Sequence, residues 1–229
     1  FEEASEADEF GSVLAAGDFD ADGVDDLAIG VPFEDLGPVT TTGIVHVIHG
    51  AAGSGLSLAT ATNWLQTIDP SEVGDGFGFA LAVGRFAGHS GHDLAIGAPL
   101  EDLGTRTDTG QVTVLYSQFL GPFDLGLTEW WSQASIYGGG FARDYDHFGI
   151  ALAGIRFDPH WDAVGAPFGI ASLAIGTPGM NTFQGGFTVV RGTTAGLAPA
   201  FKVGLFGPDF GAAPDIFQEN QSFGQVFAT

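Results

Sequence analysis

Three long segments of the chain repeat one another, and this repetition restricts the possible folds more than any other feature of the sequence. The Phe-Gly pairs that open the repeated blocks begin at residues 10, 77, 148 and 223, so successive repeats are 67, 71 and 75 residues long. Each of the first three pairs opens a block that ends in Leu-Ala-Ile-Gly-x-Pro, at 10–32, 77–99 and 148–178. A second block follows each of them: GIVHVIHG at 43–50, GQVTVLYS at 110–117 and GGFTVVRG at 185–192. Aligned blocks at nearly constant spacing indicate one structural unit that occurs three times, with residues 223–229 matching only its opening.

Each repeat holds about four segments with the pattern of a β-strand. In the first repeat they are FGSVLAAG at 10–17, DLAIG at 26–30, the alternating segment 44–48, and a segment at 63–68 that carries Trp64. The counterparts of this fourth segment lie near Trp130 and Trp131 and at Phe201 to Phe206. Clusters of Gly, Pro, Ser and Asp separate the segments, and no stretch shows a sustained helical period. The sequence therefore predicts an all-β fold made of β-propeller blades, each with four antiparallel strands.

The order of the motifs resembles a known repeat. Phe-Gly is followed by Asp-x-Asp-x-Asp-Gly-x-x-Asp and then by Leu-Ala-Ile-Gly-x-Pro, as in the FG-GAP repeat. The Gly-Ala-Pro element of that family is Gly97-Ala98-Pro99 here, with variants at 30–32 and 176–178. FG-GAP repeats form the β-propeller of integrin alpha chains and occur in many secreted bacterial proteins. The resemblance covers residues 10–229. It implies a propeller of about seven blades that binds a ligand or partner, and it does not imply an active site.

The repeats divide the chain into an acidic lead-in (1–9), three blades (10–76, 77–147 and 148–222) and the opening strand of a further blade (223–229). Propellers usually contain about four to eight blades, so we expect a partial propeller that is completed by more chain or by oligomerisation. Left uncovered, each end blade would expose about 350 Å² of largely apolar surface. The sequence stops at Thr229, inside a repeat, which favours a fragment or a blade shared between chains.

The segment DFDADGVDD at 18–26 has the composition and spacing of a cation-binding loop. Ca²⁺ takes about six to eight oxygen ligands, which a tight loop supplies from alternate positions. We therefore predict one structural Ca²⁺ bound by Asp18, Asp20, Asp22, the carbonyl oxygen of Val24, and Asp26. An EF-hand would close with Glu where Ile29 stands, so the predicted loop joins two strands. The alternative is a polar hairpin whose Asp residues cap turns without metal, but repulsion among four carboxylates would destabilise such a loop.

The other two repeats have lost this pattern. In the second repeat only Asp93 remains, opposite Asp26, and Arg85 could replace the ion by pairing with it. A zinc site at His89 and His92 is a second interpretation, although two ligands are too few. In the third repeat Arg156 takes the first position, and the loop is longer. Asp158 and Asp162 survive there with altered spacing.

The charge balance limits the partners and the compartment. Six Lys and Arg against 28 Asp and Glu give a net charge of −22, so we expect no nucleic acid partner and no binding to anionic membranes. Residues 163–190 carry no charge, but prolines and glycines interrupt them, so we expect no membrane insertion. The N-terminal FEEASEADE is not a signal peptide, and we expect any such signal to have been removed from an extracellular or cell-surface protein.

No catalytic motif accompanies the histidines, so we expect no enzymatic activity. His46 and His49 belong to opposite faces of one strand and should not act as a pair. The segment 144–147 (Asp-Tyr-Asp-His) fits a polar turn between blades.

The prediction is therefore a calcium-stabilised extracellular module for binding, adhesion or assembly. The module would bind a protein partner, or associate with itself, through the open faces of its blades. The alternatives are a carbohydrate-binding propeller and the accessory domain of a secreted hydrolase. For sugar binding the aromatic candidates are Trp130, Trp131, Tyr137 and Tyr145, of which the two tyrosines have no repeat counterparts and suit a surface better. Asn220 fits a glycosylation sequon.

Overall fold

The computed structural model describes residues 8–66, 73–118, 123, 127–156, 169–180 and 185–206, with the backbone alone from 199 to 206. It contains three antiparallel sheets of four strands each, and within each sheet the strands are neighbours in chain order. The first sheet consists of β1 (Val13–Gly17), β2 (Asp26–Val31), β3 (Ile44–Ile48) and β4 (Thr62–Trp64). The second consists of β5 (Ala80–Gly84), β6 (Asp93–Ala98), β7 (Gln111–Leu115) and β8 (Glu129–Trp131). The third consists of β9 (Leu152–Ile155), β10 (Ser172–Thr177), β11 (Gly186–Thr193) and β12 (Gly196–Phe206).

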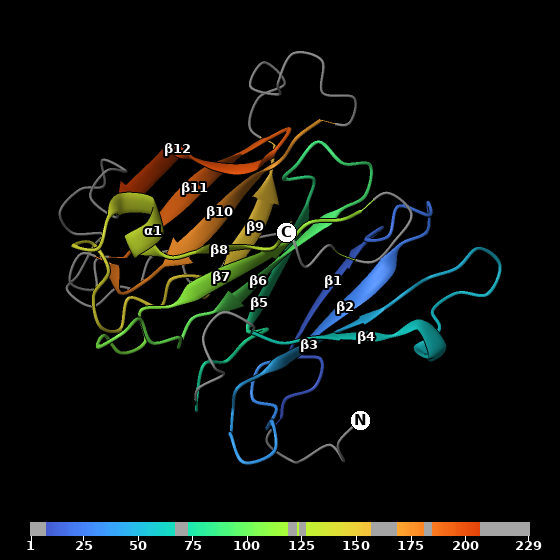
Figure 1. Cartoon of the computed structure of the whole chain (residues 1–229), viewed down its shortest axis with the longest axis horizontal. Coiled ribbons are helices and arrows are strands. Elements are labelled where there is room, and N and C mark those ends of the chain that lie inside the picture. Colours follow the sequence, from blue (N-terminus) through green and yellow to red (C-terminus); the bar gives the residue numbers. More distant parts are fainter. Residues whose placement is uncertain are drawn as a thin grey trace, which may run out of the picture.

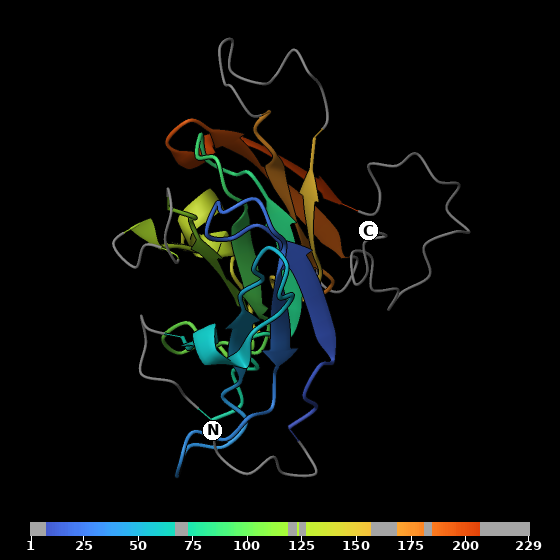
Figure 2. The same ribbon diagram turned by 90° about the vertical axis from the view of Figure 1, so that its right-hand side faces the viewer.

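The sheets follow one another in space as they do in the sequence (Figure 1). β1 lies against β5, and β5 lies against β9, so the first strand of each sheet adjoins the first strand of the next. Figure 2 shows the green sheet between the blue and the orange ones. This arrangement confirms the prediction of all-β, propeller-like blades, and over the described residues the three sheets do not close into a ring.

Helical structure is confined to two short elements in the described parts of the chain, η1 (Leu58–Thr60) and α1 (Gln133–Tyr137). α1 begins at a reciprocal cap in which Ser132 and Ser135 each accept a hydrogen bond from the backbone N–H of the other. At five residues it is too short to produce a helical period in the sequence. Neither element is long and apolar enough to cross a membrane.

The three sheets share one strand register, which confirms that the repeats are structurally equivalent. Ala15 pairs with Ala28 in the first sheet, Ala82 with Ala95 in the second, and Ala153 with Ala174 in the third. Side chains alternate along each strand, so every sheet has two different faces. An alanine–valine face carries these alanines together with the valines of the third strand. A leucine–isoleucine face lies on the opposite side.

The hydrophobic core lies between the sheets. Between the first and second sheets, the alanine–valine face of one packs on the leucine–isoleucine face of the other, through Ala28, Val45, Val47, Leu81, Leu94 and Ile96. Between the second and third sheets the same pairing recurs, through Ala82, Val112, Val114, Leu152, Leu173 and Ile175. The alanine–valine face of the third sheet carries Ala153, Ala174 and Val189.

The Phe-Gly motif connects each sheet to the one before it. The backbone N–H of Phe77 donates to the carbonyl oxygen of Thr42, 2.9 Å away, and Phe148 makes the same bond to Thr109. The following glycine carbonyl packs against the Leu-Ala-Ile-Gly strand of the preceding sheet. A Cβ placed on Gly97 would lie 2.1 Å from the carbonyl oxygen of Gly149, so only glycine permits this approach. The motif is therefore a backbone contact between blades, and Phe77 and Phe148 are buried beside it.

Candidate metal-binding site

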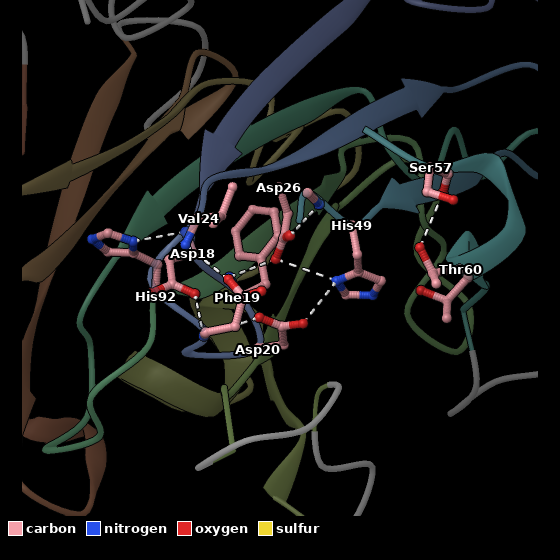
Figure 3. A network of polar contacts seen from close by, with 12 residues as sticks. Asp18, Phe19, Asp20, Val24, Asp26, His49, Ser57, Thr60 and His92 are labelled. Atoms are coloured by element: carbon pink, nitrogen blue, oxygen red, sulfur yellow. Dashed lines mark hydrogen bonds and ion pairs between the residues drawn. The ribbon is translucent and has the colours of Figure 1, made fainter. Parts of the chain in front are cut away.

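The loop between β1 and β2 gathers three of the predicted ligands. Oxygen atoms of Asp18, Asp20 and Asp22 all lie within 4.8 Å of one another. The buried ring of Phe19 anchors the loop in the core, while Ala21 and Gly23 take positive φ angles of 61° and 89° to complete the turn. Figure 3 shows Asp18 and Asp20 on this turn, beside the ring of Phe19.

The loop backbone holds these carboxylates in place. Asp18 accepts hydrogen bonds from the N–H groups of Asp22 and Gly23 at 3.0 and 3.1 Å. Asp20 accepts from Asp22 at 3.2 Å, and Asp22 accepts from Val24 at 2.8 Å. Burial, and then the negative charge of Asp26, raise the pKa of Asp20 above its usual value. A cation between the carboxylates would relieve this repulsion.

Asp26 occupies a different position from the other predicted ligands. Its side chain is buried, with one oxygen accepting the N–H of Phe19 and the other the N–H of Gly50, both at 2.8 Å. Its ligand atom groups with those of Asp20 and His49. The assignments of Asp26 and of the Val24 carbonyl as Ca²⁺ ligands remain predictions.

His49 is the residue that the sequence interpretation missed. It follows β3 directly, and its Nδ1 atom lies 3.3 Å from Asp26 Oδ2 and 3.7 Å from Asp20 Oδ2. His46 instead contacts Asn63 Oδ1 through its own Nδ1 at 2.8 Å, so the two histidines do not pair, as expected. The register pairs Leu27 with Ile48, which places Asp26 opposite His49. Only the pairing of β2 with β3 reveals this neighbour.

The equivalent loop of the second sheet has kept the buried carboxylate without the acidic cluster. Asp93 accepts the N–H of Phe86 at 2.7 Å, of Ala87 at 3.0 Å and of Ser117 at 2.9 Å. Phe86 stands 7 residues before Asp93 and Ser117 stands 24 after it, the same separations as those of Phe19 and Gly50 from Asp26. This carboxylate therefore connects the first loop to the end of the third strand in both sheets.

Among the described residues, His89 and His92, the histidines of the second loop, do not form a zinc site with a third ligand. His92 Nδ1 accepts the N–H of Asp18 at 3.0 Å, across the boundary between sheets. In the part of the chain that the structure describes, neither His89 nor His92 belongs to a group of three metal-ligating side chains. This favours the interpretation as a degenerate loop over the zinc site. Arg85 donates Nε–H to the carbonyl oxygen of Ser90 at 3.1 Å, and its pairing with Asp93 stays a prediction.

Several sequence predictions fall outside the described residues: Asp158, Asp162, Asn220 and the opening strand at 223–229. The segment 144–147 is a turn between sheets, as predicted. Tyr145 N–H donates to the carbonyl of Thr107, and His147 N–H to that of Asp108.

The aromatic candidates divide into exposed and buried residues. Trp130 and Tyr145 are 40% and 49% exposed, whereas Trp131 is buried. Tyr137 is half-buried against the core between the second and third sheets, and its hydroxyl contacts Thr188 Oγ1 at 3.0 Å. Tyr137 is therefore only partly available at the surface, because its hydroxyl end packs toward the third sheet.

Comparison with known proteins agrees with this architecture. The family model "FG-GAP repeat" matches residues 10–48. Over 149 residues, 65% of the chain, the sequence is 32% identical to human phosphatidylinositol-glycan-specific phospholipase D. Over 108 residues it is 35% identical to the mouse protein of that name, and over 92 residues 36% identical to integrin alpha pat-2 of Caenorhabditis briggsae. The chain spans 17%, 12% and 7% of these relatives. The chain thus contains an FG-GAP repeat, and its fold is β-propeller-like.

Proposed function

We propose that this chain is a calcium-stabilised extracellular module for binding, adhesion or assembly, with no catalytic activity of its own. The observation that carries the proposal is the convergence of Asp18, Asp20 and Asp22 on one turn of a propeller-like blade. Hard oxygen ligands on a flexible loop suit Ca²⁺, and Mg²⁺ sheds its water less readily. The Val24 carbonyl and Asp26 would complete the ligand set. An extracellular location fits the acidic sequence and the FG-GAP resemblance.

Chelation tests the calcium part of the proposal. At free Ca²⁺ about 100 times the dissociation constant, binding adds about 2.7 kcal/mol to the free energy of unfolding. For a chain of this size that corresponds to about 5–10 °C in melting temperature. EDTA should produce this loss in the unaltered chain, and Asp20→Ala should reproduce it without EDTA. Asp25→Ala is the matched control, because Asp25 is exposed and stands next to the same loop. Equal melting temperatures with and without EDTA would contradict calcium stabilisation.

The open faces of the outer sheets are the proposed interaction surfaces. Leu14 occupies in the first sheet the position that Leu81 takes in the second. Leu81 is 7% exposed under the preceding sheet, whereas Leu14 is 58% exposed. A partner blade, from a second copy or another protein, would bury Leu14 as the first sheet buries Leu81. With a net charge of −22, neither nucleic acid nor membrane insertion is proposed.

Light scattering over a concentration series tests this surface. The unaltered chain should associate, and Leu14→Glu should prevent association. Leu58→Glu is the control, since Leu58 is 74% exposed in η1 and away from the sheet face. A monomer at every concentration, with no protein captured by the unaltered chain, would overturn the proposed surface.

A second candidate function is that of an accessory domain in a hydrolase. The similarity to phosphatidylinositol-glycan-specific phospholipase D favours it, since this chain matches only part of that enzyme. The purified chain should then show no hydrolysis of a phosphatidylinositol-glycan substrate. Turnover by the purified chain that a mutation in the chain abolishes would contradict the absence of catalysis. A glycan array would show whether the exposed Trp130 and Tyr145 bind sugars instead.

A further inference from the structure

We propose that His49, Asp20 and Asp26 form a binding site for a divalent transition-metal ion such as Zn²⁺. The three ligand atoms lie within 4.8 Å of one another and come from the loop between β1 and β2 (Asp20), the first residue of β2 (Asp26) and the residue after β3 (His49). The inference does not depend on the calcium proposal, because it rests on an imidazole nitrogen that Ca²⁺ does not prefer.

The buried nitrogen of His49 points to an ion. The His49 side chain is 11% exposed, and that of Asp26 is 0% exposed. Figure 3 shows His49 Nδ1 directed at both carboxylates; across the described residues it makes the two ion-pair contacts given above and no hydrogen bond. A buried polar atom without a hydrogen bond is destabilising, and a metal ion removes that penalty by taking up the nitrogen lone pair.

The distances fit coordination of one ion. Zn²⁺ binds nitrogen and carboxylate oxygen at about 2.0–2.2 Å, and tetrahedral angles then separate two ligand atoms by about 3.3–3.6 Å. The observed separations from His49 Nδ1 are 3.3 Å to Asp26 Oδ2 and 3.7 Å to Asp20 Oδ2. Two carboxylates and one neutral imidazole also neutralise a divalent charge.

The fourth coordination position would face a pocket. Asp20 and His49 both line a pocket of about 410 Å³, together with the hydroxyl-bearing residues Ser54, Ser57, Thr60 and Thr62. An ion between Asp20 and His49 therefore borders this space, where water or an oxygen donor can complete the coordination. Three protein ligands with an open position are typical of zinc sites that bind an exogenous ligand.

The site shares Asp20 and Asp26 with the predicted calcium ligands, so the two ions would compete, but it lacks Asp18, Asp22 and the Val24 carbonyl and adds His49. Asp22 belongs to the acidic group of the loop and not to the histidine group, whereas His49 belongs to the histidine group alone. Asp22→Ala and His49→Ala therefore separate the two sites. His46→Ala is a control for nonspecific histidine binding, since His46, on β3, contacts Asn63 on the neighbouring strand β4.

Calorimetric titration with ZnCl₂ in calcium-free buffer tests the proposal. The unaltered chain should bind one Zn²⁺ with highest affinity. Loss of an outer-sphere partner lowers metal affinity about 10–100-fold, so loss of a direct ligand in His49→Ala should lower it by at least about 100-fold. Asp22→Ala and His46→Ala should retain the affinity of the unaltered chain. Co²⁺ on the unaltered chain should give the intense visible absorption of tetrahedral coordination, a readout that needs no variant.

Zn²⁺ binding that is unchanged in His49→Ala would overturn the proposal, as would weak octahedral Co²⁺ bands. An equal loss in Asp22→Ala would place the ion in the acidic loop instead. Circular dichroism of His49→Ala and of His49→Gln, which keeps a polar side chain of similar size, checks that the first sheet still folds. Failure of the calcium proposal would appear separately, as an absence of Ca²⁺ binding by the unaltered chain.

Discussion

Gly97→Ala should strongly destabilise the packing of the second sheet against the third. The added Cβ would lie 2.1 Å from the carbonyl oxygen of Gly149. Carbon and carbonyl oxygen approach comfortably only to about 3.3 Å, so the two backbones must separate by about 1 Å. Flexible side chains cannot absorb this shift, because both contacting groups belong to the main chain.

The size of the effect follows from the bonds that hold Gly149. Phe148 N–H donates to Thr109 at 2.9 Å, and Gly149 N–H donates to Gly176 at 3.0 Å. Straining two such hydrogen bonds and opening the core between the sheets should lower the free energy of unfolding by about 3 kcal/mol. For a chain of this length, the melting temperature should fall by about 6–12 °C.

Urea denaturation followed by circular dichroism measures this change. Gly139→Ala is the matched control, because no atom lies within 4 Å of a Cβ at that position. Both variants restrict the unfolded chain equally, so their difference isolates the contact between sheets. If Gly97→Ala is as stable as Gly139→Ala, the proposed close approach of the Phe-Gly backbone is wrong.

Two further stability predictions concern buried polar groups. Burial raises the pKa of Asp93 from its ordinary 3.8 to about 6. The folded state therefore binds the proton more tightly than the unfolded state, and the free energy of unfolding should fall by about 3 kcal/mol as the pH rises from about 4 to about 6. Urea titrations at a series of pH values should show this slope in the unaltered chain but not in Asp93→Asn; an unchanged slope would contradict the assignment. Tyr116→Phe removes the donor to Glu129 and the acceptor for Leu197 N–H, bonds of 2.6 and 2.9 Å. Tyr116→Phe should lower the free energy of unfolding by about 2 kcal/mol in the same assay. A change below about 0.5 kcal/mol would show that these two hydrogen bonds do not contribute to stability.

The repeated sequence predicted the three sheets because the hydrophobic pattern within each short segment is enough to predict a strand. Alternation in Ile44–Ile48 and the continuous apolar run at Asp26–Val31 each describe one strand and its burial. The fourth strands were located through Trp64 and Trp130, and the structure places β4 and β8 there. α1 escaped prediction because five residues with a serine cap leave no periodic pattern.

In the acidic loop, too, some contacts follow from sequence spacing and others depend on how the strands pair. Asp18, Asp20 and Asp22 lie within five residues of each other, so their spacing alone predicts that they meet around one turn. Asp26 and His49 meet only because β2 and β3 pair in a particular register. Sequence spacing carries no information about such a register until the strands are placed side by side.

The sequence by itself determined the three blades, their strand order and the acidic turn, because each depends on residues close together along the chain. The tertiary structure alone decided which face of one blade covers the next, why Gly97 must be glycine, and which carboxylates His49 meets. These contacts join backbones and side chains from different strands and blades. Their geometry is set by how the sheets pack, which no local pattern encodes.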